Sequence, residues 1–300
     1  MASWLIVTIL SYFLFALSSI GDKLFLKGKP TPASYVFYVS VFGLLVIVLI
    51  PFANFSIPGL VLLGWIILTA LTRFMAVYFA YVAIEKFEVS RVVPSIGAIQ
   101  PILMFFLAWA FFGEYIISSK NILAFLLLLL GGVLISLEKK IKFNLKYIGL
   151  TFLVALLISL DFTFAKIIYS STSFLNGFIW IFIFIFFFAM SLLLFKGPRK
   201  EIFSKSVVSN KSEQILFLGT QSCGGLASIL YNLAISLAPA AFFAIISSLK
   251  GVQYAFLFLI ALVLSIFWPK IFKENLSKNI VIKKLFAIII IIAGLIILAI

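Results

Sequence analysis

Two cationic residues of this 300-residue sequence lie deep inside long apolar stretches, where they could bind an anionic solute. Arg73 lies midway along one stretch, and Lys250 has about ten apolar or small residues on either side. Both side chains attract carboxylate or phosphate groups. If these stretches cross a membrane, each charge costs roughly 2.5–3.5 kcal/mol at the centre, so it tends to face a partner or water. We therefore interpret both cations as candidate substrate-binding residues.

Further polar and aromatic residues share helical faces at spacings of three, four and seven. Amides there would supply directional hydrogen bonds, and tyrosines could pack against an apolar or ring-bearing substrate. Gly225 and Ser228 continue the stripe that runs from Gln221 to Asn232. The candidate substrate-binding residues are Lys250, Arg73, Gln221, Asn232, Gln253, Ser247, Tyr81, Tyr231, Tyr254 and Gln100.

Two carboxylates and three backbone-altering residues complete the candidate site. Asp161 and Asp22 are the proton-coupling candidates, because carboxyl groups within a membrane serve as proton relays. Pro94, Pro101 and Gly251 are the helix-kink or gating candidates, since proline interrupts helical hydrogen bonding.

Each assignment has a structural alternative. Small and polar stripes also form dry contacts between membrane helices. Asp161 could equally neutralise a membrane lysine or arginine, and Lys166 could extend to the headgroups. The Gly131-Gly132 pair is typical of close helix packing, and Tyr12 is interpreted as a packing residue.

The composition determines which elements must position these residues. Hydrophobic residues make up 65% of the chain and charged residues only 11%, against about 45–50% and 25% in soluble domains. This excludes a soluble enzyme, a nucleic-acid-binding domain and a disordered chain. Since a spanning helix needs about 20 apolar residues, the sequence predicts an all-α polytopic membrane protein with about ten transmembrane helices. The predicted spans are 3–24, 33–52, 58–84, 89–112, 120–137, 145–168, 174–195, 213–236, 240–267 and 283–300.

The net charge of +14 resides mainly in lysines of the short predicted loops. The loops after the odd-numbered spans carry nearly all of them, which places these loops inside and both termini outside a cell membrane. We interpret this charge as setting orientation and contacting anionic headgroups rather than binding nucleic acid.

The predicted spans divide into two similar halves. Asp22-x4-Lys27 in the first recurs as Asp161-x4-Lys166 in the second, and Thr69 in the third span corresponds to Thr220 in the eighth. Each half has five spans, so the second enters the membrane inverted. We expect a first repeat over 1–140 and a second over 141–300, as in transporters with a site near the bilayer midplane.

The first half carries a run of motifs across its third, fourth and fifth predicted spans. They are Ala83-Ile84-Glu85, Val89-Ser90-Arg91-Val92-Val93-Pro94, Gln100-Pro101-Ile102, Phe112-Gly113-Glu114 and Leu130-Gly131-Gly132-Val133-Leu134-Ile135. In these motifs the chain resembles the EamA-type family of the drug/metabolite transporter superfamily. The second half departs from this pattern, with no proline equivalent and Lys273-Glu274 in place of Gly-Glu.

The resemblance implies ten helices in two inverted five-helix repeats around a central cavity, with export or exchange of small metabolites. It also implies no metal or organic cofactor and, unlike the charge count, both termini inside. Lys250 is similar to the lysine that related phosphate and nucleotide-sugar translocators place in the ninth helix.

We therefore expect a secondary transporter that moves a small anionic or zwitterionic metabolite, such as an amino acid or a phosphorylated compound, by alternating access. The alternative is a flippase for a lipid-linked or polyprenyl-linked substrate. An enzyme is disfavoured, because the chain has no His and only scattered acidic residues for acid–base or metal chemistry. The expected partners are the bilayer, the solute and coupled protons, with a monomer and a homodimer both open.

Overall fold

The computed structural model describes residues 3–25, 31–87, 89–113, 118–136, 145–204, 211–267 and 278–299, and these ranges contain helices and no strand. The α-helices are α1 (Ser3–Phe25), α2 (Pro32–Gly43), α3 (Leu60–Lys86), α4 (Val89–Phe112), α5 (Ser119–Ser136), α6 (Leu145–Ser171), α7 (Phe174–Ser191), α8 (Lys196–Ser204), α9 (Lys211–Leu237), α10 (Phe243–Ser248), α11 (Lys250–Phe267) and α12 (Lys278–Ala299). Three 3-10 helices are η2 (Leu44–Phe52), η3 (Leu192–Leu194) and η4 (Ala240–Phe242).

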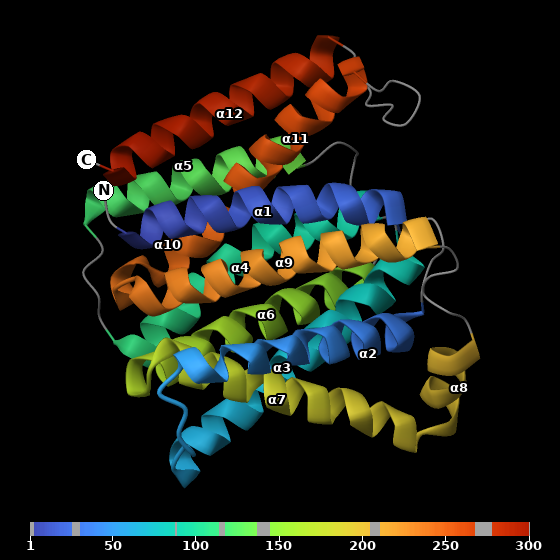
Figure 1. Ribbon diagram of the computed structural model, residues 1–300. Helices are drawn as coiled ribbons and strands as arrows, with labels where there is room; N and C mark the ends of the chain where they lie inside the picture. Colours follow the sequence, from blue (N-terminus) through green and yellow to red (C-terminus); the bar gives the residue numbers. More distant parts are fainter. Residues whose placement is uncertain are drawn as a thin grey trace.

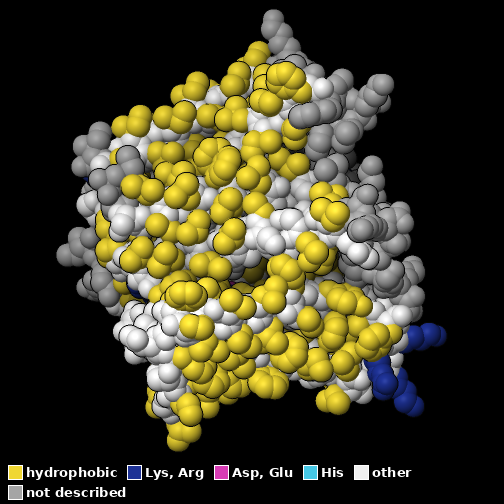
Figure 2. All heavy atoms as spheres, in the orientation of Figure 1, with side chains coloured by type: hydrophobic (Ala, Val, Ile, Leu, Met, Phe, Trp, Pro, Cys, Tyr) yellow, Lys and Arg dark blue, Asp and Glu magenta, His cyan; other side chains and the backbone are white. Residues whose placement is uncertain are grey.

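Nine helical segments within the described ranges are long and apolar enough to cross a membrane. They establish the chain as a polytopic helical membrane protein. The long helices lie side by side in a bundle, and hydrophobic side chains cover most of the face in Figure 2. The remaining predicted span coincides with α9, a 27-residue helix whose polar stripe lowers its hydropathy.

Helices distant in sequence pair throughout the bundle. α1 packs against α9 and α11, α3 against α6 and α7, and α5 against α12 (Figure 1). α6 also contacts α4, which places α6 between two helices of the first half. The site described below lies where α3, α6 and α9 meet.

Two of the predicted spans are not continuous α-helices, whereas the proline-containing fourth span is one. α4 continues as a helix through Pro94 and Pro101, whereas the ninth predicted span divides at Leu249 into α10 and α11. The second predicted span tightens into the 3-10 helix η2, which contains Pro51. α4 is therefore not broken at its prolines, and their role as kink or gating residues stays a prediction.

A short helix also forms where the sequence predicted a loop. α8 occupies residues 196–204 and has Pro198 in its first turn. Backbone N–H groups of a first turn have no partner within the helix, so proline, which lacks this group, loses no hydrogen bond there. Its Ile202 side chain is buried.

Gly251 lies at a close approach between two helices. A Cβ atom added to Gly251 in α11 would lie 2.9 Å from the Cα atom of Gly132 in α5. Gly131 packs in the same way against Ile291 of α12. The predicted packing role of the Gly131-Gly132 pair is confirmed, and Gly251 belongs to the same contact.

We expect Gly251→Ala to destabilise the protein by roughly 1–3 kcal/mol, because the added methyl group meets backbone that cannot rotate away. Thermal unfolding in detergent measures the effect. Gly225→Ala is the matched control, since nothing lies within 4 Å of a Cβ atom added there. Equal melting temperatures for both variants would contradict the close contact.

Candidate functional site

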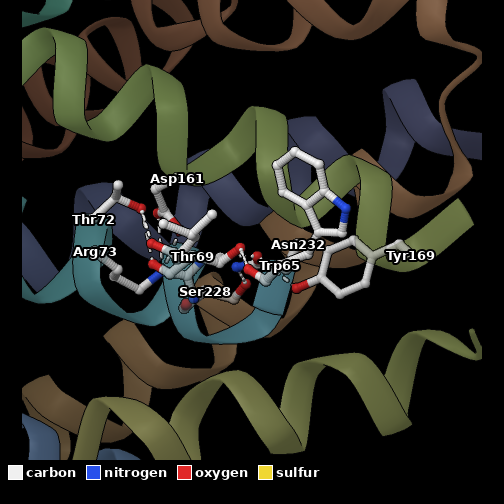
Figure 3. Close-up of polar contacts among 9 residues, drawn as sticks. Trp65, Thr69, Thr72, Arg73, Asp161, Tyr169, Ser228 and Asn232 are labelled. Carbon is white, nitrogen blue, oxygen red and sulfur yellow. Dashed lines mark hydrogen bonds and ion pairs between the residues drawn. The ribbon is translucent and has the colours of Figure 1, made fainter. Parts of the chain in front are cut away.

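A buried ion pair joins α3 to α6. The Nε atom of Arg73 donates to both carboxylate oxygens of Asp161, at 3.0 and 2.9 Å. The two side chains are 13% and 4% exposed. Figure 3 shows them facing each other from neighbouring helices. A buried charge without a partner is strongly destabilising, and here each of the two charges compensates the other.

Two further residues extend this ion pair into a network that reaches α9. Arg73 donates from Nη2 to Oδ1 of Asn232 at 3.1 Å, and the Tyr169 hydroxyl donates to the same oxygen at 3.0 Å (Figure 3). The Asn232 amide nitrogen donates to the backbone oxygen of Ser228 at 2.9 Å. These bonds hold the amide in one orientation. Sequence reasoning missed Tyr169, although it lies eight residues after Asp161 and hence near the same helical face.

The guanidinium of Arg73 retains one nitrogen without a hydrogen-bond partner among the described residues. Its Cζ atom lies 5.9 Å from the ring centroid of Phe162 and 5.6 Å from that of Phe182, within cation–π range. Its Nη1 atom is buried and has no hydrogen-bond partner within the described ranges. A buried donor without an acceptor destabilises a protein by about 1–3 kcal/mol. This nitrogen is therefore suited to donate a hydrogen bond to an oxygen of a bound solute.

Lys250 forms a second polar cluster between α11 and α4. Its Nζ atom donates to Oε1 of Gln100 at 3.4 Å, and Gln100 is only 3% exposed. The Gln100 amide nitrogen donates to the Met104 sulfur at 3.7 Å, and the Tyr254 hydroxyl donates to the backbone oxygen of Val93 at 3.5 Å. Within the described part of the chain, no carboxylate lies within ion-pair distance of Lys250. Its charge is thus uncompensated there, unlike that of Arg73.

Aromatic side chains extend from the first cluster to α10, the short helix before Lys250. The Tyr231 ring lies 4.9 Å from that of Phe162, which flanks Arg73, and 5.5 Å from that of Tyr12. The Tyr12 hydroxyl donates to the backbone oxygen of Ile246 at 2.9 Å, four residues before Lys250. Tyr12 therefore packs as predicted, and Tyr231 is a buried core residue.

The remaining candidate residues lie outside both clusters. Tyr81 stacks on Tyr35 of α2, with ring centroids 3.7 Å apart. Gln253 donates to Ser19 of α1 at 3.4 Å, and the buried Ser247 hydroxyl bonds the backbone of its own helix. Gln221 makes no side-chain hydrogen bond with another described residue. Asp22 lies in α1, but its side chain is outside the described residues.

The Lys166 side chain is bonded to the end of α9. It is 7% exposed, and its Nζ atom donates to the backbone oxygens of Ile235, Ser236 and Ala238 at 3.0, 3.1 and 2.6 Å. These carbonyls end α9, where a cation satisfies groups that have no partner within the helix. The structure gives Lys166 protein acceptors at the end of α9, and its extension to the headgroups stays a prediction.

Comparison with known proteins supports the fold. No protein-family model and no curated protein match the sequence. Among solved structures 26 chains match. One, described only as a crystal structure of a protein, is similar over 98% of this chain and 96% of its own length, with a TM-score of 0.70 and 14% identity. At that identity the likeness concerns the fold alone.

We expect Asp161→Asn to destabilise the protein by about 3–5 kcal/mol, because it leaves the buried Arg73 charge unpaired. The double variant Arg73→Met with Asp161→Leu removes both charges and should lose less stability than the two single variants together. Thermal unfolding of Arg73→Met, Asp161→Leu and the double variant, each compared with the unchanged protein, gives the double-mutant cycle. Additive losses would contradict a direct coupling between the two side chains.

Proposed function

We propose that this protein is a secondary transporter of the EamA type, within the drug/metabolite transporter superfamily, which moves a small organic metabolite across a cell membrane by alternating access. The observation that carries the proposal is a pair of cationic groups with donors left uncommitted inside an apolar helical bundle. These are the Nη1 atom of Arg73 and the ammonium of Lys250. Charged groups at such depth usually mark solute pathways.

The charge balance of the two clusters favours a solute with an anionic group. Arg73 and Asp161 cancel, and Lys250 leaves one positive charge, which one bound carboxylate would balance and one phosphate, at about −1.5 to −2, would more than balance. A zwitterionic amino acid or a phosphorylated metabolite carries such a group. The planar guanidinium and the compact ammonium are both suited to bind it.

Helix pairing supports the proposed arrangement of ten spans in two inverted repeats, 1–140 and 141–300, with α9 as the eighth span. Equating each span with the one five positions later relates the α1–α9 pair to the α6–α3 pair. The same equivalence relates the α1–α11 pair to the α6–α4 pair. The α5–α12 pair and the α2–α7 pair each correspond to themselves, because their two members are five spans apart. Such a relation is expected for two halves that surround a midplane site.

The location of the polar network suits a rocking mechanism. The Arg73–Asp161 pair joins α3 of the first half to α6 of the second, and Asn232 adds α9. A solute oxygen bound to Arg73 would therefore join a network that already links both halves. Relative motion of the halves could then open the site first to one side of the membrane and then to the other.

A metabolite panel tests the proposed substrate class. A ligand that binds only the folded protein raises its stability in proportion to RT ln(1 + [L]/Kd). We expect amino acids or phosphorylated metabolites to raise the melting temperature of the purified protein. Stabilisation only by a short polyprenyl phosphate would support the flippase alternative instead, and no stabilisation by any solute would contradict transport of this class.

We expect Lys250→Ala to abolish uptake of the stabilising solute into proteoliposomes, with folded protein retained. Loss of a charge-assisted hydrogen bond costs about 1.5–3 kcal/mol, or about ten- to hundredfold in affinity. Lys120→Ala is the control, because Lys120 is an exposed lysine at the start of α5. Flux by Lys250→Ala at the control rate would overturn the role of Lys250.

A further inference from the structure

The short helix α8 carries three basic residues on one face. Lys196, Arg199 and Lys200 lie at spacings of three and four, so they neighbour one another on the helix surface. All three are exposed, and the structure gives their side chains no hydrogen bond or ion pair with another described residue. In Figure 2 the Lys and Arg side chains visible on this face gather mainly at the corner where Figure 1 places α8.

Another side of α8 is anchored to the bundle. The Ser34 hydroxyl donates to the backbone oxygen of Glu201 at 3.0 Å, and the Tyr38 hydroxyl donates to that of Ile202 at 3.3 Å. The Ile202 side chain is 0% exposed. Because α2 anchors α8 through these contacts, the three basic residues have a defined position at the end of the spans.

Large apolar side chains border the same basic residues. Leu194 and Phe195, immediately before α8, are 82% and 61% exposed, and Phe203 is 67% exposed. Exposed phenylalanine and leucine beside unpaired Lys and Arg are typical of a helix that lies in the membrane interface. The apolar groups would enter the acyl region, and the cations would remain at the level of the phosphates.

We propose that α8 binds the headgroups of anionic phospholipids. The helix holds three basic residues against one acidic residue, Glu201, and anionic lipids attract basic segments with roughly 1 kcal/mol per Lys or Arg near the surface. In the orientation that the loop charges predict, α8 lies on the side where anionic lipids attract basic loops. This binding is independent of the transported solute.

The test titrates dioctanoyl-phosphatidylglycerol into the detergent-solubilised full-length protein and measures its dissociation constant. In the variant Arg199→Gln with Lys200→Gln, we expect an affinity about 25-fold lower than that of the unchanged protein, or about fivefold per removed charge. The matched control is Lys86→Gln with Lys120→Gln, which removes two exposed lysines elsewhere. The control should bind the lipid as the unchanged protein does.

Two additional ligands distinguish a site for anionic headgroups from general lipid adsorption and from binding of free phosphate. Dioctanoyl-phosphatidylcholine and inorganic phosphate should bind more weakly than phosphatidylglycerol, because the first lacks net negative charge and the second lacks acyl chains. If phosphatidylcholine or inorganic phosphate bound as tightly as phosphatidylglycerol, the proposal would be overturned. Equal losses of phosphatidylglycerol affinity in the α8 variant and its control would also overturn it. Unchanged lipid binding by the α8 variant would also overturn it.

Discussion

An arginine buried among apolar helices must have its charge compensated, and Asp161 does so for Arg73 at 2.9 Å. This constraint ties α3 to α6, because a buried charge without a partner is costly. Asn232 and Tyr169 then take positions around the guanidinium, which brings α9 to the same point. The buried ion pair thus defines where three helices meet.

The rest of the bundle is organised so that polar groups meet at a few contacts while apolar surface faces outward. Lys166 neutralises the carbonyl end of α9, and Gln100 accepts a hydrogen bond from Lys250. Elsewhere Gly132 and Gly251 allow α5 and α11 to approach closely without any polar bond. The two polar clusters differ in one respect that matters for function: the first is electrically balanced, whereas Lys250 lacks an acidic partner among the described residues.

Sequence reasoning anticipated much of the helical framework and some of the site. It selected Arg73, Asp161, Asn232, Lys250 and Gln100, because charged and amide side chains are conspicuous in apolar spans. It treated Arg73 as an anion-binding residue and Asp161 first as a proton carrier, with charge neutralisation as the alternative, and the structure pairs the two. It missed Tyr169, since a single tyrosine in a span resembles any packing residue, and it did not anticipate that Gly251 lies at a close contact with Gly132.

The amino-acid sequence by itself determined that this is a polytopic helical membrane protein with a few charges inside its spans, because composition and the length of apolar runs are properties of the chain alone. Only the tertiary structure decided which of those charges compensate one another. A span of 27 residues such as α3 or α6 presents side chains in every direction. Whether Arg73 meets Asp161, a headgroup or water depends on which helices are adjacent and how each is rotated.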